Sequence, residues 1–122
     1  MTTERRKQLE AAGIDMGEAL ERMMGNEALL ERLLGKFPDD PQYPTLCAAL
    51  GCGDMERATA AAHTLKGVCG NLSMTELFRL FTAQVEALRA GDLSAARSLM
   101  EQIASAYARV TAAIRRRADE ER

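Results

Sequence analysis

A single histidine, His63, is the side chain of this sequence with the clearest capacity for chemistry. It lies in a segment rich in good helix formers, which we predict to be a helix that Asp54 caps and that runs to about Leu72. At roughly 100° per residue, Leu65 and Leu72 lie on the opposite side of that helix and form its apolar face. His63 is therefore expected to point outward, where a neutral imidazole can act as a nucleophile near neutral pH.

The residues that share a helical face with His63 are small, with one exception. They are Thr59 and Ala60 one turn before it, Gly67 and Gly70 after it, and the exception Lys66. Glycine inside a helix costs about 1 kcal/mol relative to alanine, so two glycines one turn apart call for an explanation. Tight helix packing is one explanation, but beside an exposed imidazole a bare surface also lets another protein approach closely.

An exposed imidazole beside an ammonium group fits reversible phosphoryl transfer. Lys66 lies three positions after His63, so its charge can offset the charge of a phosphoryl group on the imidazole nitrogen. Attack on an aspartyl phosphate would give a phosphoramidate, and the reverse step would return the group. Such an exchange needs positioning and charge stabilisation more than covalent machinery.

The whole chain predicts helices, because good helix formers dominate and no run alternates apolar and polar residues as a strand would. Capping residues and glycines delimit helices over about residues 3–12, 16–24, 26–37, 45–50, 54–72, 75–90 and 93–118. Three prolines within residues 38–44 indicate a connection or a broken helix. We expect one all-α domain over residues 1–122, in which the helices at 16–24 and 26–37 pack with the three long ones as an antiparallel bundle.

Residues 62–72, which read AHTLKGVCGNL, resemble the signature of the histidine phosphotransfer (HPt) domain family. That signature is His-x-Leu-Lys-Gly, followed by two small residues and, a few positions later, an apolar-Gly pair. Residues 13–20 resemble the first bundle helix of the family and residues 26–37 its second helix. The resemblance thus extends over most of residues 13–112.

By position, the resemblance implies that His63 is the phosphoacceptor, that Lys66 stabilises the phosphoryl group and that Gly67 gives a receiver domain room. It implies an up-down four-helix bundle, to which this chain adds a short N-terminal helical extension. The implied function is a phosphocarrier rather than an enzyme, with response-regulator receiver domains and a hybrid sensor histidine kinase as partners. No cofactor of its own is expected, since the receiver would supply Mg²⁺. Receivers should dock on Thr59, Ala60, Gly67 and Gly70.

Three positions depart from the family pattern. Ser73 stands where the family usually has glycine, and Cys69 stands where alanine or serine is common. Some members carry a glutamine near the acceptor on the following helix. Gln84 lies one position early for that role, so we assign it none.

Composition argues against other classes of protein. The formal net charge is −2, so no excess of basic residues predicts nucleic-acid binding. No apolar run approaches the roughly 18 residues of a membrane span, and the charged N-terminal residues do not resemble a signal peptide. We therefore expect a cytoplasmic monomer. At 122 residues and without a glycine-rich nucleotide-binding motif, the chain does not predict an autonomous kinase.

Two alternatives stay open at this stage. Cys47, Cys52, His63 and Cys69 could supply the ligands of a zinc site, although their spacing lacks the close Cys-x2-Cys pair typical of such sites. The chain could also be a helical protein-interaction module that does not transfer phosphate and in which His63 has no role.

Overall fold

The secondary structure of the chain is helical. The computed structural model describes the backbone of residues 1–120 and the side chains of residues 1–116. Its elements are α1 (Thr3–Ala11), α2 (Met16–Arg22), α3 (Glu27–Lys36), the 3-10 helix η1 (Phe37–Asp39), α4 (Gln42–Cys52), α5 (Met55–Asn71), α6 (Thr75–Arg89) and α7 (Leu93–Glu120). Within this range the only extended pairing is one isolated antiparallel bridge, between Ile14 and Met74. The predicted all-α fold is confirmed, and positions 121–122 of the predicted domain lie outside the described residues.

Local capping signals set the beginnings of three helices where the sequence predicts them. The carboxylates of Asp15 and Asp54 and the side-chain oxygen of Asn26 accept hydrogen bonds from first-turn N–H groups of α2, α5 and α3, at 3.0–3.1 Å. Gly53 ends α4 with φ of +77°, a left-handed conformation that glycine adopts without steric cost. The predicted helix ends agree with the structure because a cap bonds to groups within a few residues of it in sequence.

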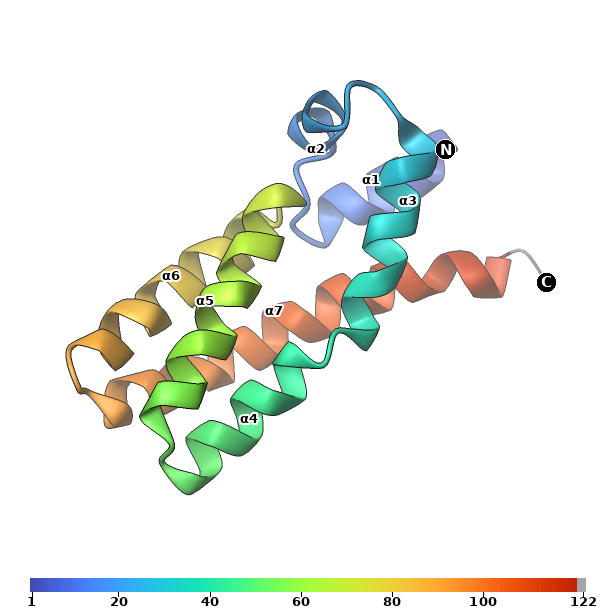
Figure 1. The fold of residues 1–122 in the computed structure, drawn as a ribbon. Helices are drawn as coiled ribbons and strands as arrows, with labels where there is room; N and C mark the ends of the chain where they lie inside the picture. Colours follow the sequence, from blue (N-terminus) through green and yellow to red (C-terminus); the bar gives the residue numbers. More distant parts are fainter. Residues whose placement is uncertain (121–122) are drawn as a thin grey trace.

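Helices α4, α5, α6 and α7 form the body of the molecule, and each packs against the next along the chain (Figure 1). Turns at residues 53–54, 72–74 and 90–92 join them. Because the turns are this short, consecutive helices run in opposite directions. Helices α1, α2 and α3 lie toward the end of this body at which α5 passes into α6 (Figure 1).

The helix expected at 45–50 was placed too late in the sequence. Helix α4 begins at Gln42, and Pro44 lies in its first turn. Proline is tolerated there because first-turn N–H groups have no acceptor within the helix. The predicted break at the prolines consists of η1 and the two residues that follow it.

The sequence also predicts that the helix at 16–24 packs in the bundle with the three long helices, but α4 is the helix that packs along α5. That expectation was wrong for a simple reason of length. Helix α2 has 7 residues and α5 has 17, so α2 is too short to run along it. Helix α3, η1 and α4 follow one another as a bent arm instead (Figure 1).

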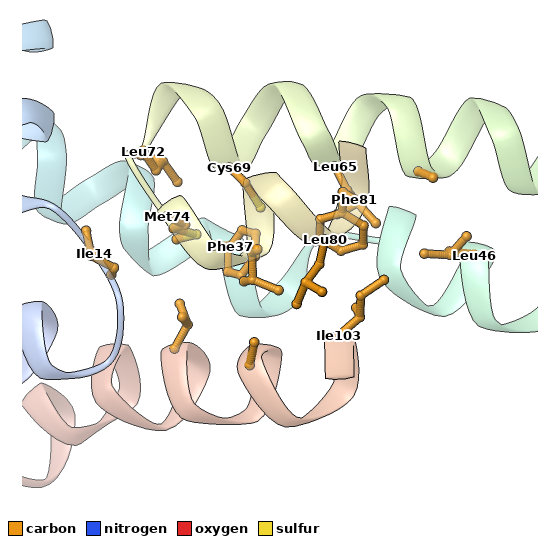
Figure 2. Packing of buried hydrophobic residues seen from close by; sticks show 14 of the residues in the cluster. Ile14, Phe37, Leu46, Leu65, Cys69, Leu72, Met74, Leu80, Phe81 and Ile103 are labelled. Carbon is orange, nitrogen blue, oxygen red and sulfur yellow. The ribbon is translucent and has the colours of Figure 1, made fainter. Parts of the chain in front are cut away.

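The core lies where α4, α5 and α6 face α7 (Figure 2). Each helix contributes apolar side chains at a spacing of three or four residues, and the largest of these are fully buried, among them Leu46, Leu65, Leu80, Phe81 and Ile103. Leu65 and Leu72 are both buried, which confirms the apolar face predicted for the helix that carries His63.

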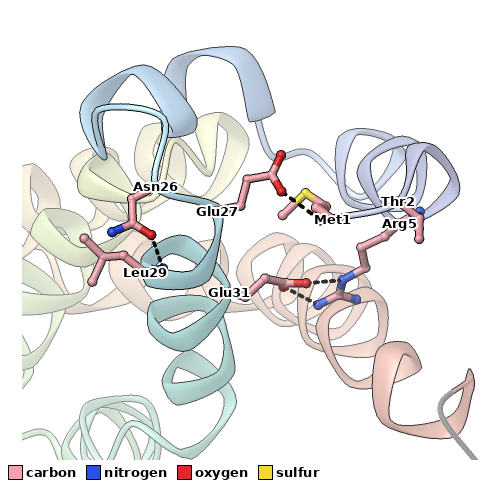
Figure 3. A network of polar contacts seen from close by, with 7 residues as sticks. All are labelled: Met1, Thr2, Arg5, Asn26, Glu27, Leu29 and Glu31. Carbon is pink, nitrogen blue, oxygen red and sulfur yellow. Dashed lines mark hydrogen bonds and ion pairs between the residues drawn. The ribbon is translucent and has the colours of Figure 1, made fainter.

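Arg5 connects α1 to α7 and to α3, and Figure 3 shows its contact with Glu31 of α3. Its guanidinium donates to the carboxylate of Glu31 on α3 at 3.0 and 3.3 Å, and to the backbone oxygen of Ala113 on α7 at 2.6 Å. The Arg5 side chain is only 5% exposed. A charge buried to this degree requires such partners, so the contacts fix the N-terminal extension to the bundle.

Candidate functional site

Helix α5 presents His63 to solvent near the middle of its length. Alanines and leucine on the other side of the helix, among them Ala61, Ala62 and Leu65, are buried in the core. These apolar residues fix the rotation of α5, because turning the helix would expose them. The predicted outward orientation of His63 is therefore confirmed.

The five residues predicted around His63 all lie on α5, but only three of them share a hollow with it. Lys66, Gly67 and Gly70 line that hollow together with His63. Thr59 and Ala60 lie one turn earlier and do not line it. The Thr59 hydroxyl donates to the backbone oxygen of Met55 at 2.7 Å, so this group is already satisfied within the helix.

The hollow has a volume of about 310 Å³ and lies where three helices meet. Helix α5 forms its floor, α2 contributes one residue and α6 another. The lining residues are Arg22, His63, Lys66, Gly67, Gly70, Asn71 and Phe78. Two of these carry a positive charge and none carries a carboxylate, so the hollow favours an anion.

Phe78 forms the wall of the hollow on the α6 side. Phe78 is 40% exposed, so its ring is accessible from the hollow. The ring lies 5.9 Å from the ammonium nitrogen of Lys66, a cation–π contact that holds the lysine beside the hollow. A Cβ at Gly70 would stand 3.2 Å from this ring, so the absence of a side chain at position 70 provides the space for Phe78.

Arg22 forms the wall on the α2 side. Its guanidinium donates to the carboxylate of Glu18 at 3.0 Å, and the pair is about half exposed on both sides. The same Glu18 oxygen accepts a hydrogen bond from the hydroxyl of Ser73, also at 3.0 Å. Ser73 thus links the turn after α5 to α2, and through Glu18 to Arg22.

Ser73, at the position where the family usually has glycine, adopts the backbone conformation that a glycine would have. Its φ is +54°, in the left-handed region that favours glycine, and its side chain is buried. The hydrogen bond to Glu18 compensates in part for this backbone strain. The turn therefore keeps a glycine-like conformation although the residue is serine.

Arg22, Asn71 and Phe78 were not among the candidates that the sequence indicated. A helical wheel describes one helix, whereas Arg22 and Phe78 come from two others. In the sequence Phe78 lies at the edge of the apolar stripe of its helix, close to Phe81 and Val85, so its spacing did not distinguish it from a core residue.

The alternative zinc site is not assembled. Cys69 is buried in the core, whereas His63 is exposed on the same helix, and Cys47 and Cys52 are exposed on α4. Within the described part of the chain, no three histidine, cysteine, aspartate or glutamate residues cluster as a metal site would require. Gln84 is fully buried and donates to the backbone oxygen of Ala96 at 3.0 Å, so it points into the core.

Comparison with known proteins assigns the chain to a class. A family model described as the Hpt domain matches residues 15–113, which are 99 of the 122 residues. The chain belongs to the Hpt domain family, whose members are phosphocarrier modules of phosphorelays. Neither the curated proteins nor the solved structures include a match to it. None of the helices in the described residues is long and apolar enough to cross a membrane.

Proposed function

We propose that this protein is a phosphorelay intermediate that accepts a phosphoryl group on His63 from the aspartyl phosphate of one receiver domain and passes it to the aspartate of another. Membership of the Hpt domain family supports histidine phosphotransfer in general. The assignment of the acceptor and of its neighbours rests on the geometry around His63.

One observation carries the proposal. The exposed imidazole of His63, in the middle of α5, is flanked by Lys66 and by Gly67, which has free space where a side chain would be. Lys66 follows one turn after His63 and shares its hollow, so its charge can offset that of a phosphoryl group. A Cβ at Gly67 would meet nothing within 4 Å. The bare surface at position 67 therefore has no packing partner inside the described chain, and approach by another protein gives it a use.

The transfer step is a displacement at phosphorus. A lone pair of the neutral His63 imidazole attacks the phosphorus of the aspartyl phosphate, so that a P–N bond forms and the P–O bond to the aspartate breaks. The aspartate leaves as a carboxylate, and the phosphorylated ring can release its remaining N–H proton to water. Attack by a second receiver's carboxylate reverses these changes and restores the imidazole.

The hollow around His63 does not fit a divalent cation. Mg²⁺ prefers carboxylate, carbonyl and water oxygens, whereas the charged groups of this hollow are Arg22 and Lys66. We therefore assign Mg²⁺ to the receiver domain. The contribution of this chain is to present the imidazole and to place positive charge beside the transferred group.

The receiver is expected to dock over α5 on Thr59, Ala60, Gly67 and Gly70, with Phe78 of α6 as an apolar contact at the rim. Such docking should be brief, because a carrier that held its partner tightly would turn over slowly. A hybrid sensor histidine kinase would supply the phosphoryl groups of the relay. The carrier would act as a monomer in the cytoplasm.

The test is phosphotransfer from a phosphorylated receiver domain. The wild-type chain should acquire an acid-labile, base-stable phosphoryl group, and His63→Gln should acquire none while keeping its helical circular dichroism. If the wild type takes up no phosphate, or if His63→Gln still does, the alternative of an interaction module without phosphotransfer would be favoured.

A further inference from the structure

The hollow beside His63 holds two cations, Arg22 and Lys66, and they come from different helices. Arg22 comes from α2, 41 positions before the histidine, yet it lines the same hollow as His63 and Lys66. No carboxylate lines that hollow. Its chemistry is thus that of an anion site with two cations from different helices.

We infer that Arg22 is a second phosphoryl-binding cation, which exchanges its contact with Glu18 for one with the phosphoryl group when His63 is phosphorylated. This inference rests on the proposed function. It adds a residue outside α5 to the site and couples the state of His63 to the position of the Arg22 side chain.

The ion pair that holds Arg22 can be released at small cost. Arg22 and Glu18 are 49% and 46% exposed, and an exposed pair at this spacing contributes little to stability. A phosphoryl group near neutral pH carries more negative charge than one carboxylate and offers three acceptor oxygens to a guanidinium. Arginine also suits this task, because its planar fork can donate two hydrogen bonds to one phosphate.

Glu18 has a second partner besides Arg22, so the arginine can leave it. The Ser73 hydroxyl donates to the same Glu18 oxygen at 3.0 Å. Glu18 therefore keeps a partner when Arg22 leaves, and it does not have to follow the arginine toward the phosphoryl group. In the absence of phosphate, Glu18 holds the guanidinium at the edge of the hollow.

The experiment measures how nearby charge affects the ionisation of the phosphorylated His63 ring. His63 is phosphorylated with phosphoramidate, a small donor whose P–N bond breaks as ammonia leaves, so no receiver is needed. Titration followed by ³¹P NMR then gives the pH midpoint at which the phosphorylated imidazole ring loses its N–H proton. A nearby cation lowers this midpoint because it disfavours the protonated, positively charged form of the ring.

Four variants are compared with the wild type. Arg22→Gln should raise the midpoint by about half a pH unit, Arg22→Lys should restore part of the difference, and Glu18→Gln should lower the midpoint because it releases the arginine. Arg6→Gln is the matched control, since Arg6 forms an exposed pair with Glu10 at the same spacing but does not line the hollow. Its midpoint should equal that of the wild type.

The outcomes separate this inference from the proposed function. If His63 is phosphorylated but Arg22→Gln titrates as the wild type does, Arg22 has no such role, while phosphotransfer stands. If Arg22→Gln and Glu18→Gln shift the midpoint in the same direction, the ion pair acts only through the fold of α2 and the inference is wrong. If neither phosphoramidate nor a phosphorylated receiver labels His63, the proposed function itself fails.

Discussion

The ring of Phe78 on α6 lies against Gly70 on α5, so closely that a Cβ at position 70 would stand 3.2 Å from the ring's Cε2 and 3.3 Å from its Cδ2. Gly67, one turn earlier, differs, because a Cβ there would meet nothing within 4 Å. The two glycines of the motif therefore have different uses. Gly70 accommodates an aromatic ring of the chain itself, whereas the bare surface at Gly67 is available to a partner.

Gly67→Ala should stabilise the fold and impair transfer at the same time. Alanine in a helix is favoured over glycine by about 1 kcal/mol, and the new methyl group meets no neighbour in this structure. Urea denaturation should therefore show a higher free energy of unfolding. Transfer from a phosphorylated receiver should slow, because the methyl group occupies the space that docking requires. Faster or unchanged transfer would argue against a close approach at this position.

Gly70→Ala provides the comparison within the same helix. The gain in helix propensity should be offset, because the Phe78 ring must shift by a few tenths of an ångström to accept the Cβ. We expect a smaller increase in stability than for Gly67→Ala, measured by the same urea denaturation. An equal increase would mean that the ring moves freely.

Phe78→Ala should weaken receiver docking with little loss of stability. The side chain is 40% exposed, so its removal uncovers less of the core than a buried phenylalanine would. An aromatic contact at an interface is typically worth about 1 kcal/mol or more, which corresponds to roughly fivefold in affinity. Transfer rates at several receiver concentrations would measure this change. Arg89→Ala, at the far end of α6, should leave the rates unchanged.

Most helix boundaries were predictable because their causes are local. Asp15, Asn26 and Asp54 each bond to an N–H three residues later, and such a signal is visible in the sequence. The orientation of His63 was predictable for the same reason, since Leu65 and Leu72 lie on the same helix. The start of α4 was missed because a proline in the first turn resembles a break when only the sequence is considered.

The composition of the site was only half predictable. Arg22 and Phe78 reach the hollow because α2 and α6 pack beside the same end of α5, a relationship that no spacing within one segment encodes. The residue pattern shows which side of a helix is buried, but it does not show which neighbour covers it. Ser73 illustrates the same limit, because its partner Glu18 lies 55 positions away in sequence.

Substitutions at Ser73 should separate backbone strain from hydrogen bonding. Ser73→Ala loses the bond to Glu18 and keeps the left-handed φ of +54°, whereas Ser73→Gly loses the bond but relieves the strain. We expect the glycine variant to be more stable than the alanine variant by about 1 kcal/mol in urea denaturation. Equal stabilities would show that the backbone at this turn carries no strain.

Arg5→Ala should destabilise the protein by about 2–3 kcal/mol. The substitution removes both contacts to Glu31 and the one to the backbone oxygen of Ala113, all made by a side chain that is 5% exposed. Arg6→Ala, which breaks an exposed pair on the same helix, should change stability by less than about 0.5 kcal/mol. Similar losses for the two variants in urea denaturation would mean that the contacts of α1 to α3 and α7 contribute nothing.

Cys69 should make the fold lose stability at alkaline pH. Burial raises the pKa of the Cys69 thiol from 9.0 to about 12. Above pH 9 the thiol ionises in the unfolded chain but stays protonated in the folded one, so the unfolded state binds fewer protons and the free energy of unfolding falls as pH rises. Between pH 8 and pH 10 this effect should amount to about 1 kcal/mol.

Cys69→Ala is the variant that tests this effect. It lacks the thiol, and any loss of stability from the space that the sulfur leaves is independent of pH. Tyr43, whose pKa burial raises to about 12, contributes equally to both proteins. The free energy of unfolding is measured by urea denaturation at pH 8, 9 and 10. It should fall more steeply with pH for the wild type than for Cys69→Ala, so the two values converge if the alanine variant is the less stable one at pH 8. An equal dependence on pH in the two proteins would contradict the burial of the thiol.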